Sequence, residues 1–433
     1  MKRKKTAIII GSGAGGAMAA RELQGEFDVT ILESGGAFKP YKGDISKLAF
    51  LQKSGLLFDE RMMRITMPSM QVTKNDGMVV VRGKGIGGTT TLSAANGIRY
   101  DEPLKELGID LDSEFEDIFN EVSVTTKHQL GWSAVTKKMY SVFEDMGLDP
   151  VVTPKMIDLR KCRRCGQCIL GCDYGAKWDS RVLINESLSK GAKLISKCKV
   201  RKLEISDGHV KAVHTITGVR KKKYTADLII LSAGGIGTPI ILENSGIKCK
   251  KTLFADPVLC VAAHYENAGQ YNQIGMPFIS QQEKYMISPY FDYLSFFFNK
   301  SWRMPQKNIL SLMIKYMDEE SGYVTPHSVH KGVTASDRKV IDESVELCKD
   351  VLERMGVKRN EIFLGTLNAG HPGGMFPLTE NEAETFHNPM LPENLYVSDS
   401  SLFPRSMGNP PILTIMAMSK RIAKLCISRI NEL

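Results

Sequence analysis

Residues 6–33 constrain the fold of this chain more than any other stretch. They contain an apolar run, the sequence GSGAGG from Gly11, a helix-forming run, and a second apolar run that ends in Glu33. A strand, a G-x-G-x-x-G turn, a helix, a second strand and an acid in this order form a dinucleotide-binding fingerprint. A glycine-rich turn without a ligand is the alternative, but here strand, helix, second strand and acid are all in place. The sequence therefore predicts a dinucleotide site near its N-terminus.

Each residue type in this pattern has a physical role. Gly11 allows the tight turn, Gly13 lets a pyrophosphate approach the backbone, and Gly16 lets the helix pack closely on the strand. The helix N-terminus offers free N–H groups and a positive dipole to the phosphates. Glu33 is placed to accept hydrogen bonds from a ribose diol, and its carboxylate would repel a 2′-phosphate. NADP is therefore disfavoured, and FAD or NAD remain.

Composition excludes several classes of protein. The chain has 433 residues, 42% of them hydrophobic and 24% charged, as in a soluble globular protein with two domains. Its net charge of +9 is a weak hint of an acidic partner, although a solvated surface explains it equally well. No apolar run approaches the length of a membrane span, and the apolar run after the basic N-terminus is interrupted at Gly11, so it is a strand rather than a signal peptide. We expect a cytoplasmic protein with no transmembrane segment and no nucleic-acid partner.

The strand–turn–helix pattern returns far along the chain. Residues 228–247 contain an apolar strand, a second glycine turn and a helix for which Thr238 and Pro239 are the expected N-cap and first residue. Residues 193–218 alternate short β runs around Asp207-Gly208, which indicates a hairpin. The chain thus returns to the dinucleotide sheet, and its middle is inserted rather than appended.

Four segments together resemble the glucose–methanol–choline (GMC) oxidoreductase family, flavoenzymes that oxidise alcohols. They are the fingerprint, GIGGTTT with the following Asn96-Gly97, SAGGIGTPIILENSGI from Ser232, and NLYVSDSSLFP to GNPPILTIMAM from Asn394. The resemblance implies an α/β fold, a Rossmann-like FAD-binding domain with an inserted α+β substrate domain. The FAD-binding domain would comprise residues 1–110, 155–248 and 368–433, and the substrate or cap domain residues 111–154 and 249–367. The cap is matched only by position, and the chain is shorter than most members of the family.

The resemblance also implies roles for individual residues. The ADP half of FAD would be held by Gly11, Gly13, Ala14, Gly16 and Glu33, with Val200 near the adenine. The phosphates and the isoalloxazine would be lined by Gly88, Thr89, Thr90, Asn96 and Gly97. Asp399 would face the ribityl or phosphate region, and Pro410 would start a helix that points at the flavin pyrimidine.

The catalytic pair of this family is a histidine followed, tens of residues later, by a histidine or asparagine before a proline. The resemblance places that pair at His371, in NAGHPGG, and Asn409, in GNPP. Histidine is the natural base for a hydroxyl proton near neutral pH, and an asparagine can bind the alcohol oxygen without titrating.

Four of the nine cysteines are crowded into the loop 160–180, in a C-x2-C-x2-C-x3-C run. They are Cys162, Cys165, Cys168 and Cys172. This spacing is typical of an iron–sulfur cluster, most often 4Fe-4S. The fourth ligand stays open between Cys172 and a remote Cys198, Cys249 or Cys260, and no proline follows Cys172 as it does in ferredoxins. A structural zinc site and unused thiols are the alternatives. Some long-chain alcohol oxidase-like members of the family look to have a similar run of cysteines.

These features predict an FAD-dependent dehydrogenase acting on a CH–OH group, whose electrons leave through the cluster to a one-electron acceptor such as an acidic ferredoxin. A flavin reductase fed by ferredoxin, acting on a carbonyl or double bond, is one alternative, and a non-catalytic electron-transfer subunit is another. The substrate would be a small-molecule alcohol, and a hydrophobic alcohol is one option. The aromatic run at 290–302 either shapes an apolar pocket or meets a membrane surface, but we favour the buried inner face of a sheet.

Overall fold

A five-stranded parallel sheet forms the centre of the first domain, in the order β19-β10-β1-β2-β6. The computed structural model describes residues 3–42, 69–75, 78–326 and 328–431. The strands are β1 (Lys5–Ile10), β2 (Phe27–Leu32), β6 (Lys193–Ile195), β10 (Leu228–Leu231) and β19 (Leu395–Val397). In the central strand, Ala7 pairs with Leu228 on one side and with Val29 on the other. The sheet therefore joins strands from the two ends and the middle of the chain, as the returning strand–turn–helix pattern predicts.

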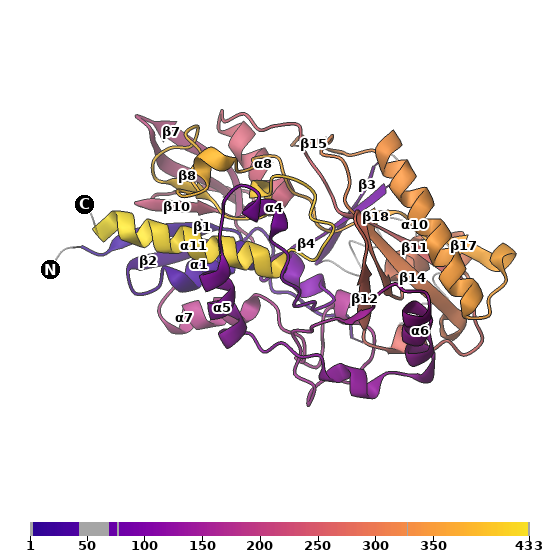
Figure 1. Cartoon of the computed structure of the whole chain (residues 1–433). Helices are drawn as coiled ribbons and strands as arrows, with labels where there is room; N and C mark the ends of the chain where they lie inside the picture. The colour runs from indigo at the N-terminus through magenta and orange to yellow at the C-terminus, as the bar shows by residue number, and fades with distance from the viewer. Residues whose placement is uncertain (1–2, 43–68, 76–77, 327, 432–433) are drawn as a thin grey trace.

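Several helices cover one face of this sheet, and a smaller sheet lies with one helix, α8, on the other side (Figure 1). The helices of the first domain are α1 (Ala14–Glu22), α4 (Glu102–Lys105), α5 (Asp112–Glu121), α7 (Arg181–Ser189), α8 (Gly234–Asn244) and α11 (Ile412–Asn431). α1 packs against α7 and α11, and α5 packs against α11. The antiparallel sheet beside α8 consists of β7 (Lys199–Ser206), β8 (His209–Thr217) and β9 (Arg220–Tyr224). The hairpin predicted at Asp207-Gly208 is confirmed, because Ser206 pairs with His209.

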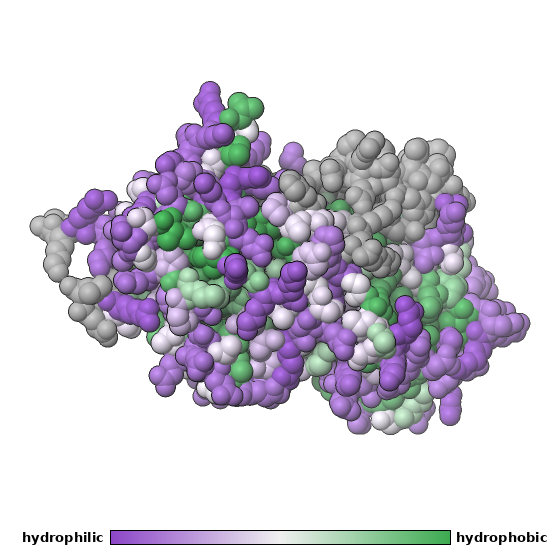
Figure 2. Space-filling model, turned by 90° about the horizontal axis from the view of Figure 1, so that it is seen from above, coloured by the Kyte–Doolittle hydropathy of each residue, from purple (hydrophilic) through white to green (hydrophobic). Residues whose placement is uncertain are grey.

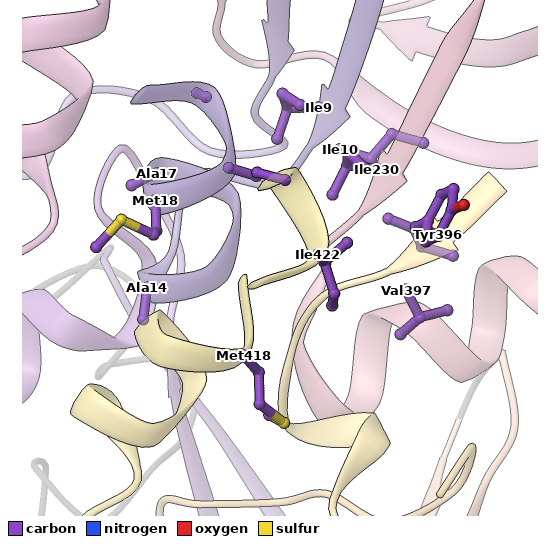
Figure 3. Packing of buried hydrophobic residues seen from close by; sticks show 14 of the residues in the cluster. Ile9, Ile10, Ala14, Ala17, Met18, Ile230, Tyr396, Val397, Met418 and Ile422 are labelled. Carbon is purple, nitrogen blue, oxygen red and sulfur yellow. The ribbon is translucent and has the colours of Figure 1, made fainter. Parts of the chain in front are cut away.

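Small residues let α1 and α11 come close to each other and to the sheet. Figure 3 shows Ala14 and Ala17 of α1 near Met418 of α11, beside the isoleucines of β1 and β10. A Cβ on Gly15 would lie 1.9 Å from the Ser398 carbonyl oxygen, so a larger residue has no room there. The fingerprint helix is therefore fixed by the last helix of the fold.

A second, larger sheet forms the other domain, in the order β3-β4-β18-β11-β14-β13-β12-β5, with β17 also paired to β11. Its strands are β3 (Met70–Asn75), β4 (Met78–Gly83), β5 (Val151–Val152), β11 (Pro257–His264), β12 (Phe278–Gln281), β13 (Tyr285–Pro289), β14 (Ile309–Tyr316), β17 (Ile362–Leu364) and β18 (Asn368–Ala369). A separate hairpin pairs β15 (Tyr323–Val324) with β16 (Val329–His330).

This sheet is buried on both faces. Leu259 and Val261 of β11 pack into a core with α6 (Ala134–Asp145) and α10 (Ala335–Arg354), whereas Cys260 belongs to the core on the opposite face. The period of two residues is that of a strand. The 3₁₀ helices are η3 (Gly88–Leu92), η4 (Lys127–Gly131), η5 (Cys168–Leu170), η6 (Gln270–Asn272), η7 (Lys300–Trp302), η8 (Gln306–Asn308), η9 (Arg359–Glu361), η10 (Glu380–Glu382) and η11 (Ser400–Leu402).

Two local predictions are wrong. α8 begins at Gly234 rather than after Thr238, so Pro239 lies inside the helix. The reason is a distant cap, because the Asp399 carboxylate accepts hydrogen bonds from Gly234 N and Thr238 Oγ1. The aromatic run, expected as one face of a sheet, is buried but includes a short helix, α9 (Tyr293–Phe298), whose N-terminus is capped by Asp292.

Most of the face seen from above in Figure 2 is hydrophilic, with hydrophobic residues in smaller patches between charged ones. Among the described residues, no helix combines the length and the apolar character that crossing a membrane requires.

Candidate active site

The turn between β1 and α1 has the shape of a phosphate-binding loop. Gly11 has a φ of +104°, and a Cβ there would lie 2.1 Å from the Ser232 carbonyl oxygen. A Cβ on Gly16 would lie 2.1 Å from the Gly11 carbonyl oxygen, so this glycine keeps helix and strand close. A Cβ on Gly13 would meet nothing within 4 Å, and no side chain caps the helix that begins at Ala14. The open space and the uncapped helix end fit a dinucleotide pyrophosphate.

Glu33 lies at the end of β2, where a ribose diol is expected, but its carboxylate already has partners. Its side chain is buried, and it accepts hydrogen bonds from Ser12 Oγ and from Gly35 N, both at 2.6 Å. Ser12 Oγ also accepts from Gly87 N at 3.1 Å. Ser12 thus joins the fingerprint to the second glycine segment. The sequence does not indicate this role, because Ser12 occupies a position of the motif that accepts any residue. A ribose would share Glu33 with Ser12.

The second glycine segment meets the first. Gly88, the first residue of η3, has a φ of +54°, and a Cβ on it would lie 2.9 Å from Gly13 Cα. Thr90 is buried, and its hydroxyl donates to the Gly87 carbonyl oxygen at 2.7 Å, whereas Thr89 is exposed. The structure therefore brings the two predicted phosphate-lining segments into contact.

Asn96 and Gly97 belong to a buried polar cluster. Lys155 Nζ donates to Asn96 Oδ1, and Asn96 Nδ2 donates to Met276 Sδ at 2.9 Å. Gly97 N donates to the Pro154 carbonyl oxygen at 2.8 Å. The Asn96 side chain thus has protein partners, and its contact with an isoalloxazine stays a prediction.

The remaining predicted cofactor residues lie at two strand ends. Val200 of β7 is buried two residues after Cys198, whose N–H donates to the Glu33 carbonyl oxygen at 2.8 Å. Asp399 follows β19 and accepts from Gly234 N at 2.8 Å, and burial raises the pKa of its carboxyl group. Val200 therefore lies two residues beyond the backbone contact with Glu33, and its contact with an adenine stays a prediction, whereas Asp399 caps α8.

His371 lies in the loop after β18, beside a buried ion pair that the sequence does not reveal. Its Nδ1 atom is 3.9 Å from Asp256 Oδ2, and Lys315 Nζ is 2.9 Å from the same oxygen. The His371 side chain is 31% exposed but Nδ1 is buried, so the exposed part of the ring lies away from Asp256. Burial, together with the Lys315 charge, lowers the pKa of His371 to about 3, which keeps the ring neutral at pH 7. A single lysine within the apolar sequence of β14 is the signal that was missed.

Asp256 also joins this loop to the segment before Asn409. Its other carboxylate oxygen, Oδ1, accepts hydrogen bonds from Ser406 Oγ at 2.5 Å, from Met407 N at 2.9 Å and from Gly408 N at 3.0 Å. The backbone of Asp256 has a φ of +48°, a conformation that is uncommon for a residue with a side chain. A single carboxylate thus contacts both predicted catalytic loops.

Asn409 itself is buried, and its Nδ2 donates to Gln281 Oε1 at 3.2 Å. Pro410 and Pro411 follow directly and precede the first residue of α11, Ile412. The helix therefore begins where the sequence predicts, beside the predicted catalytic asparagine.

A second buried ion pair lies next to the first. Lys331 Nζ is 3.0 Å from Asp318 Oδ2, and both side chains are 0% exposed. Asp318 shares the Ser406 hydroxyl with Asp256, at 2.9 Å. Burial raises the pKa of Asp318 to about 6, which the Lys331 charge opposes.

All four cysteines of the predicted cluster line one pocket. Cys162, Cys165, Cys168 and Cys172 are lining residues, whereas the remote Cys198, Cys249 and Cys260 are not. Backbone N–H groups point at the sulfurs: Arg164 N donates to Cys162 Sγ and Ala176 N donates to Cys172 Sγ, both at 3.4 Å. Burial raises the pKa of the Cys168 thiol to about 11, although two nearby lysines oppose this.

Those lysines, Lys155 and Lys177, are buried without a carboxylate in ion-pair distance among the described residues. Lys177 Nζ donates to the carbonyl oxygens of Thr91 at 2.7 Å and Cys168 at 3.1 Å, and so connects η3 to the cysteine loop. Burial lowers the pKa of Lys177 to about 8 and that of Lys155 to about 7, and the Cys168 sulfur has the opposite effect on both.

Within the described ranges, no three His, Cys, Asp or Glu side chains form a group that could hold a metal ion. The cysteines therefore share a pocket, but the metal site expected from their spacing is not shown.

Comparison with known proteins shows the family and the fold. Residues 6–275 match the family model described as GMC oxidoreductase. The uncharacterized protein MJ1450 of Methanocaldococcus jannaschii is 27% identical, over 96% of this chain and 98% of that protein. Long-chain-alcohol oxidase FAO1 of Arabidopsis thaliana is 22% identical, over 98% of this chain and 67% of the oxidase.

Solved structures with similar folds are oxidases by their titles. Pyridoxine 4-oxidase from Mesorbium loti has a TM-score of 0.71 at 13% identity, covering 97% of this chain and 98% of that chain. Formate oxidase from Aspergillus oryzae, in a study of FAD modification, has a TM-score of 0.70 at 13% identity, with 99% of both chains covered. At such identities the likeness concerns the fold alone.

Proposed function

The chain belongs to the GMC oxidoreductase family and is an FAD-dependent oxidoreductase, and we propose that it oxidises an alcohol at His371 and passes the electrons through an iron–sulfur cluster. The observation that carries the alcohol proposal is the placement of His371 and the Asn409 segment on the two oxygens of one buried carboxylate, Asp256. The name of the Arabidopsis relative, a long-chain-alcohol oxidase, supports the substrate class.

The FAD would be held by the residues that have room for it. The open space at Gly13 and the uncapped start of α1 fit its pyrophosphate, and the buried carboxylate of Glu33 fits its ribose. When bound, FAD supplies the acceptor for the hydride that leaves the carbinol carbon.

His371 is the proposed base for the hydroxyl proton. The ring is neutral at pH 7, because burial lowers its pKa to about 3, and a neutral imidazole has a lone pair for the proton. Asn409 is the proposed donor to the alcohol oxygen, which would replace its bond to Gln281. An alcohol hydroxyl is a very weak acid, so loss of a hydride from carbon requires a base that takes the proton in step.

Three features support a cluster at the cysteine pocket. Four cysteines with ferredoxin-like spacing line it, and backbone N–H groups point at the sulfurs of Cys162 and Cys172. The buried charges of Lys155 and Lys177 would be balanced by a cluster with thiolate ligands, since a buried cation is costly without an anion. A single zinc ion would need the sulfurs around one point, whereas a cluster binds each cysteine at a different metal atom.

An acidic one-electron carrier, such as a ferredoxin, is the proposed electron acceptor. Arg163 and Arg164 line the cysteine pocket, and Arg160 and Lys161 beside it have side chains that are 91% and 62% exposed. Like-signed charges around a redox centre would steer an oppositely charged carrier toward it, and salt would weaken the effect.

Anaerobic purification followed by stopped-flow reduction with a panel of alcohols tests the proposal. We expect bound FAD, iron with an EPR signal after reduction, and bleaching of the flavin by at least one alcohol.

His371→Ala should lower the rate of flavin reduction at least about 10²-fold, which corresponds to about 3 kcal/mol of activation free energy, while FAD stays bound. Asn409→Ala should cost less, because a neutral hydrogen bond contributes roughly 0.5–1.5 kcal/mol. A His371→Ala enzyme that reduces its flavin at the wild-type rate refutes the alcohol mechanism. If the enzyme instead oxidises a reduced one-electron carrier only when a carbonyl compound is present, the alternative function as a reductase is favoured.

A further inference from the structure

We propose that Asp256 is a positioning residue for His371, which keeps Nδ1 protonated so that Nε2 is the base, and that Lys315 balances the Asp256 charge in the resting enzyme. This inference rests on the proposed function of His371 and extends it to two residues that the sequence pattern does not mark.

The first observation is a ring nitrogen that faces a carboxylate without a hydrogen bond to it. His371 Nδ1 is buried without a hydrogen-bond partner among the described residues, and it lies 3.9 Å from Asp256 Oδ2. Lys315 Nζ is 2.9 Å from the same oxygen and balances its charge. Hydrogen bonds in catalytic groups are often long before substrate binds and shorten in the complex. A small rotation of the ring would therefore give Nδ1 its missing partner.

The second observation is the orientation of the ring. Nδ1 is buried on the Asp256 side, whereas 31% of the side chain is exposed, so the accessible ring atoms lie on the other side. In a neutral imidazole only one nitrogen has a proton, and a carboxylate beside Nδ1 favours the proton on that atom. The lone pair is then on Nε2, at the accessible side, where an alcohol would approach.

The third observation is the charge balance of the site. Asp256 and Asp318 are paired with Lys315 and Lys331, so the four buried charges sum to zero while His371 is neutral. Among the described residues, the charged groups that act on His371 are Asp256, directly before β11, and Lys315 of β14. Lys315 opposes protonation of the ring and Asp256 favours it, so the pair sets how readily His371 accepts a proton.

The proposed step is balanced in atoms and charge. The O–H bond of the alcohol breaks, and its proton forms an N–H bond at His371 Nε2. The O–H electron pair stays on oxygen and forms the C=O bond as the hydride leaves the carbinol carbon, and FAD, when bound, would be the hydride acceptor. Asp256 stays ionised and accepts a hydrogen bond from Nδ1–H of the resulting imidazolium, as a buried carboxylate does for histidine in other enzymes.

Nitrogen NMR of the ¹⁵N-histidine-labelled holoenzyme tests the tautomer without any change to the site. We expect a neutral His371 ring at pH 7 with the proton on Nδ1, its signals assigned by their loss in His371→Gln. A proton on Nε2 in the wild-type holoenzyme overturns the proposal. That result is separate from failure of the proposed function, which shows as full flavin reduction in His371→Ala.

Two charge variants test the pair by the pH profile of flavin reduction. Lys315→Met should move the acidic limb of the profile to higher pH, because a cation beside the ring is lost. Asp256→Asn should reduce the rate at pH 7 at least about 10-fold and should not move the acidic limb to higher pH.

Asp337→Asn is the matched control, a buried aspartate that caps α10 and does not face His371. It should change the stability of the protein but not the pH profile of flavin reduction. If both site variants lose stability and leave the limb and the rate per folded enzyme unchanged, the pair is only structural. If Lys315→Met does not fold, the tautomer measurement still decides.

Discussion

Two buried sites in this molecule contain lysines, and they balance those positive charges in different ways. Beside His371, Lys315 pairs with Asp256 at 2.9 Å and Lys331 pairs with Asp318 at 3.0 Å. Each cation has its anion from the chain itself. The site is therefore electrically complete before any ligand binds, and its lysines serve the folded protein as well as the chemistry.

Near the cysteine pocket, Lys155 and Lys177 donate only to carbonyl and amide oxygens among the described residues. These dipoles hold the ammonium groups in place, but they do not supply a negative charge. Since burial of an uncompensated charge is costly, the proposed cluster and its cysteine ligands would supply the missing negative charge, to which Asp179 adds for Lys177. The contrast teaches that a buried lysine paired with an acid is balanced by the fold itself, whereas a buried lysine without a paired acid leaves room for an anionic ligand.

The largest expected effect is loss of all iron when a pocket cysteine is changed. Cys168→Ser should abolish iron and the broad visible absorption of anaerobically purified protein, and FAD should stay bound, since the phosphate loop is elsewhere. Iron analysis and absorption spectra measure both. Cys249→Ser is the control, because Cys249 does not line the pocket. Wild-type protein that is free of iron but fully active would refute the proposed cluster in the cysteine pocket.

Breaking a completed pair should cost a large part of the stability. Lys331→Met leaves Asp318 buried without its cation, and removal of one partner of a buried pair destabilises by about 3–5 kcal/mol. We expect this loss in urea denaturation, equally with and without iron. A loss that appears only in the iron-loaded protein would contradict the view that this site is complete by itself.

Lys177→Met should affect the retention of the proposed cluster rather than the stability of the iron-free fold. The cluster would lose a nearby buried cation, so iron should leave to a chelator about 10-fold faster, which corresponds to about 1.4 kcal/mol. The rate of iron loss is followed by absorbance. Lys315→Met, which removes a buried lysine from the other site, should leave that rate unchanged, and equal rates for Lys177→Met and wild type would refute the proposed charge balance.

An effect of similar size concerns acid stability. The pKa of His371 is about 3 in the folded protein and near 6.5 when unfolded, so the unfolded chain binds the proton first as pH falls. This contribution is complete above pH 6.5 and is lost as pH falls toward 3. Between pH 6.5 and 5, wild type should lose about 1–2 kcal/mol relative to His371→Gln. The difference between the two proteins cancels the contribution of Asp318, whose raised pKa has the opposite sign. If the free energy of unfolding of wild type and of His371→Gln changed with pH in the same way, the pKa of His371 would not be lowered in the folded protein.

The sequence predicted the first domain well, because its signals are local. The fingerprint, the hairpin at 207–208 and the strand–turn–helix after residue 227 each depend on neighbouring residues, and the structure has all three. The start of α8 was missed, because its cap comes from Asp399, which is 165 residues from Gly234. The domain boundaries stay a prediction.

The site was predicted in part, for the same reason. The resemblance pointed to His371 and Asn409, but the carboxylate that joins their loops, Asp256, has no motif of its own. Its pairing with Lys315 spans 59 residues and depends on how β11 and β14 align. Distances of this kind cannot be read from spacing along the chain, because they exist only after two strands have paired.

The strand order of the parallel sheet also has a consequence for synthesis on the ribosome. β1 is the middle strand, yet its neighbour β10 and the outer strand β19 follow about two hundred and four hundred residues later, and α11 closes the core after them. While these segments are still being made, the nascent β1 and the apolar side of α1 have no permanent cover, since loop closure over such lengths must wait for the partner. We therefore expect the dinucleotide site to form late, after the cap sheet has had time to assemble. A cell that makes this protein would rely on chaperones to protect its first thirty residues.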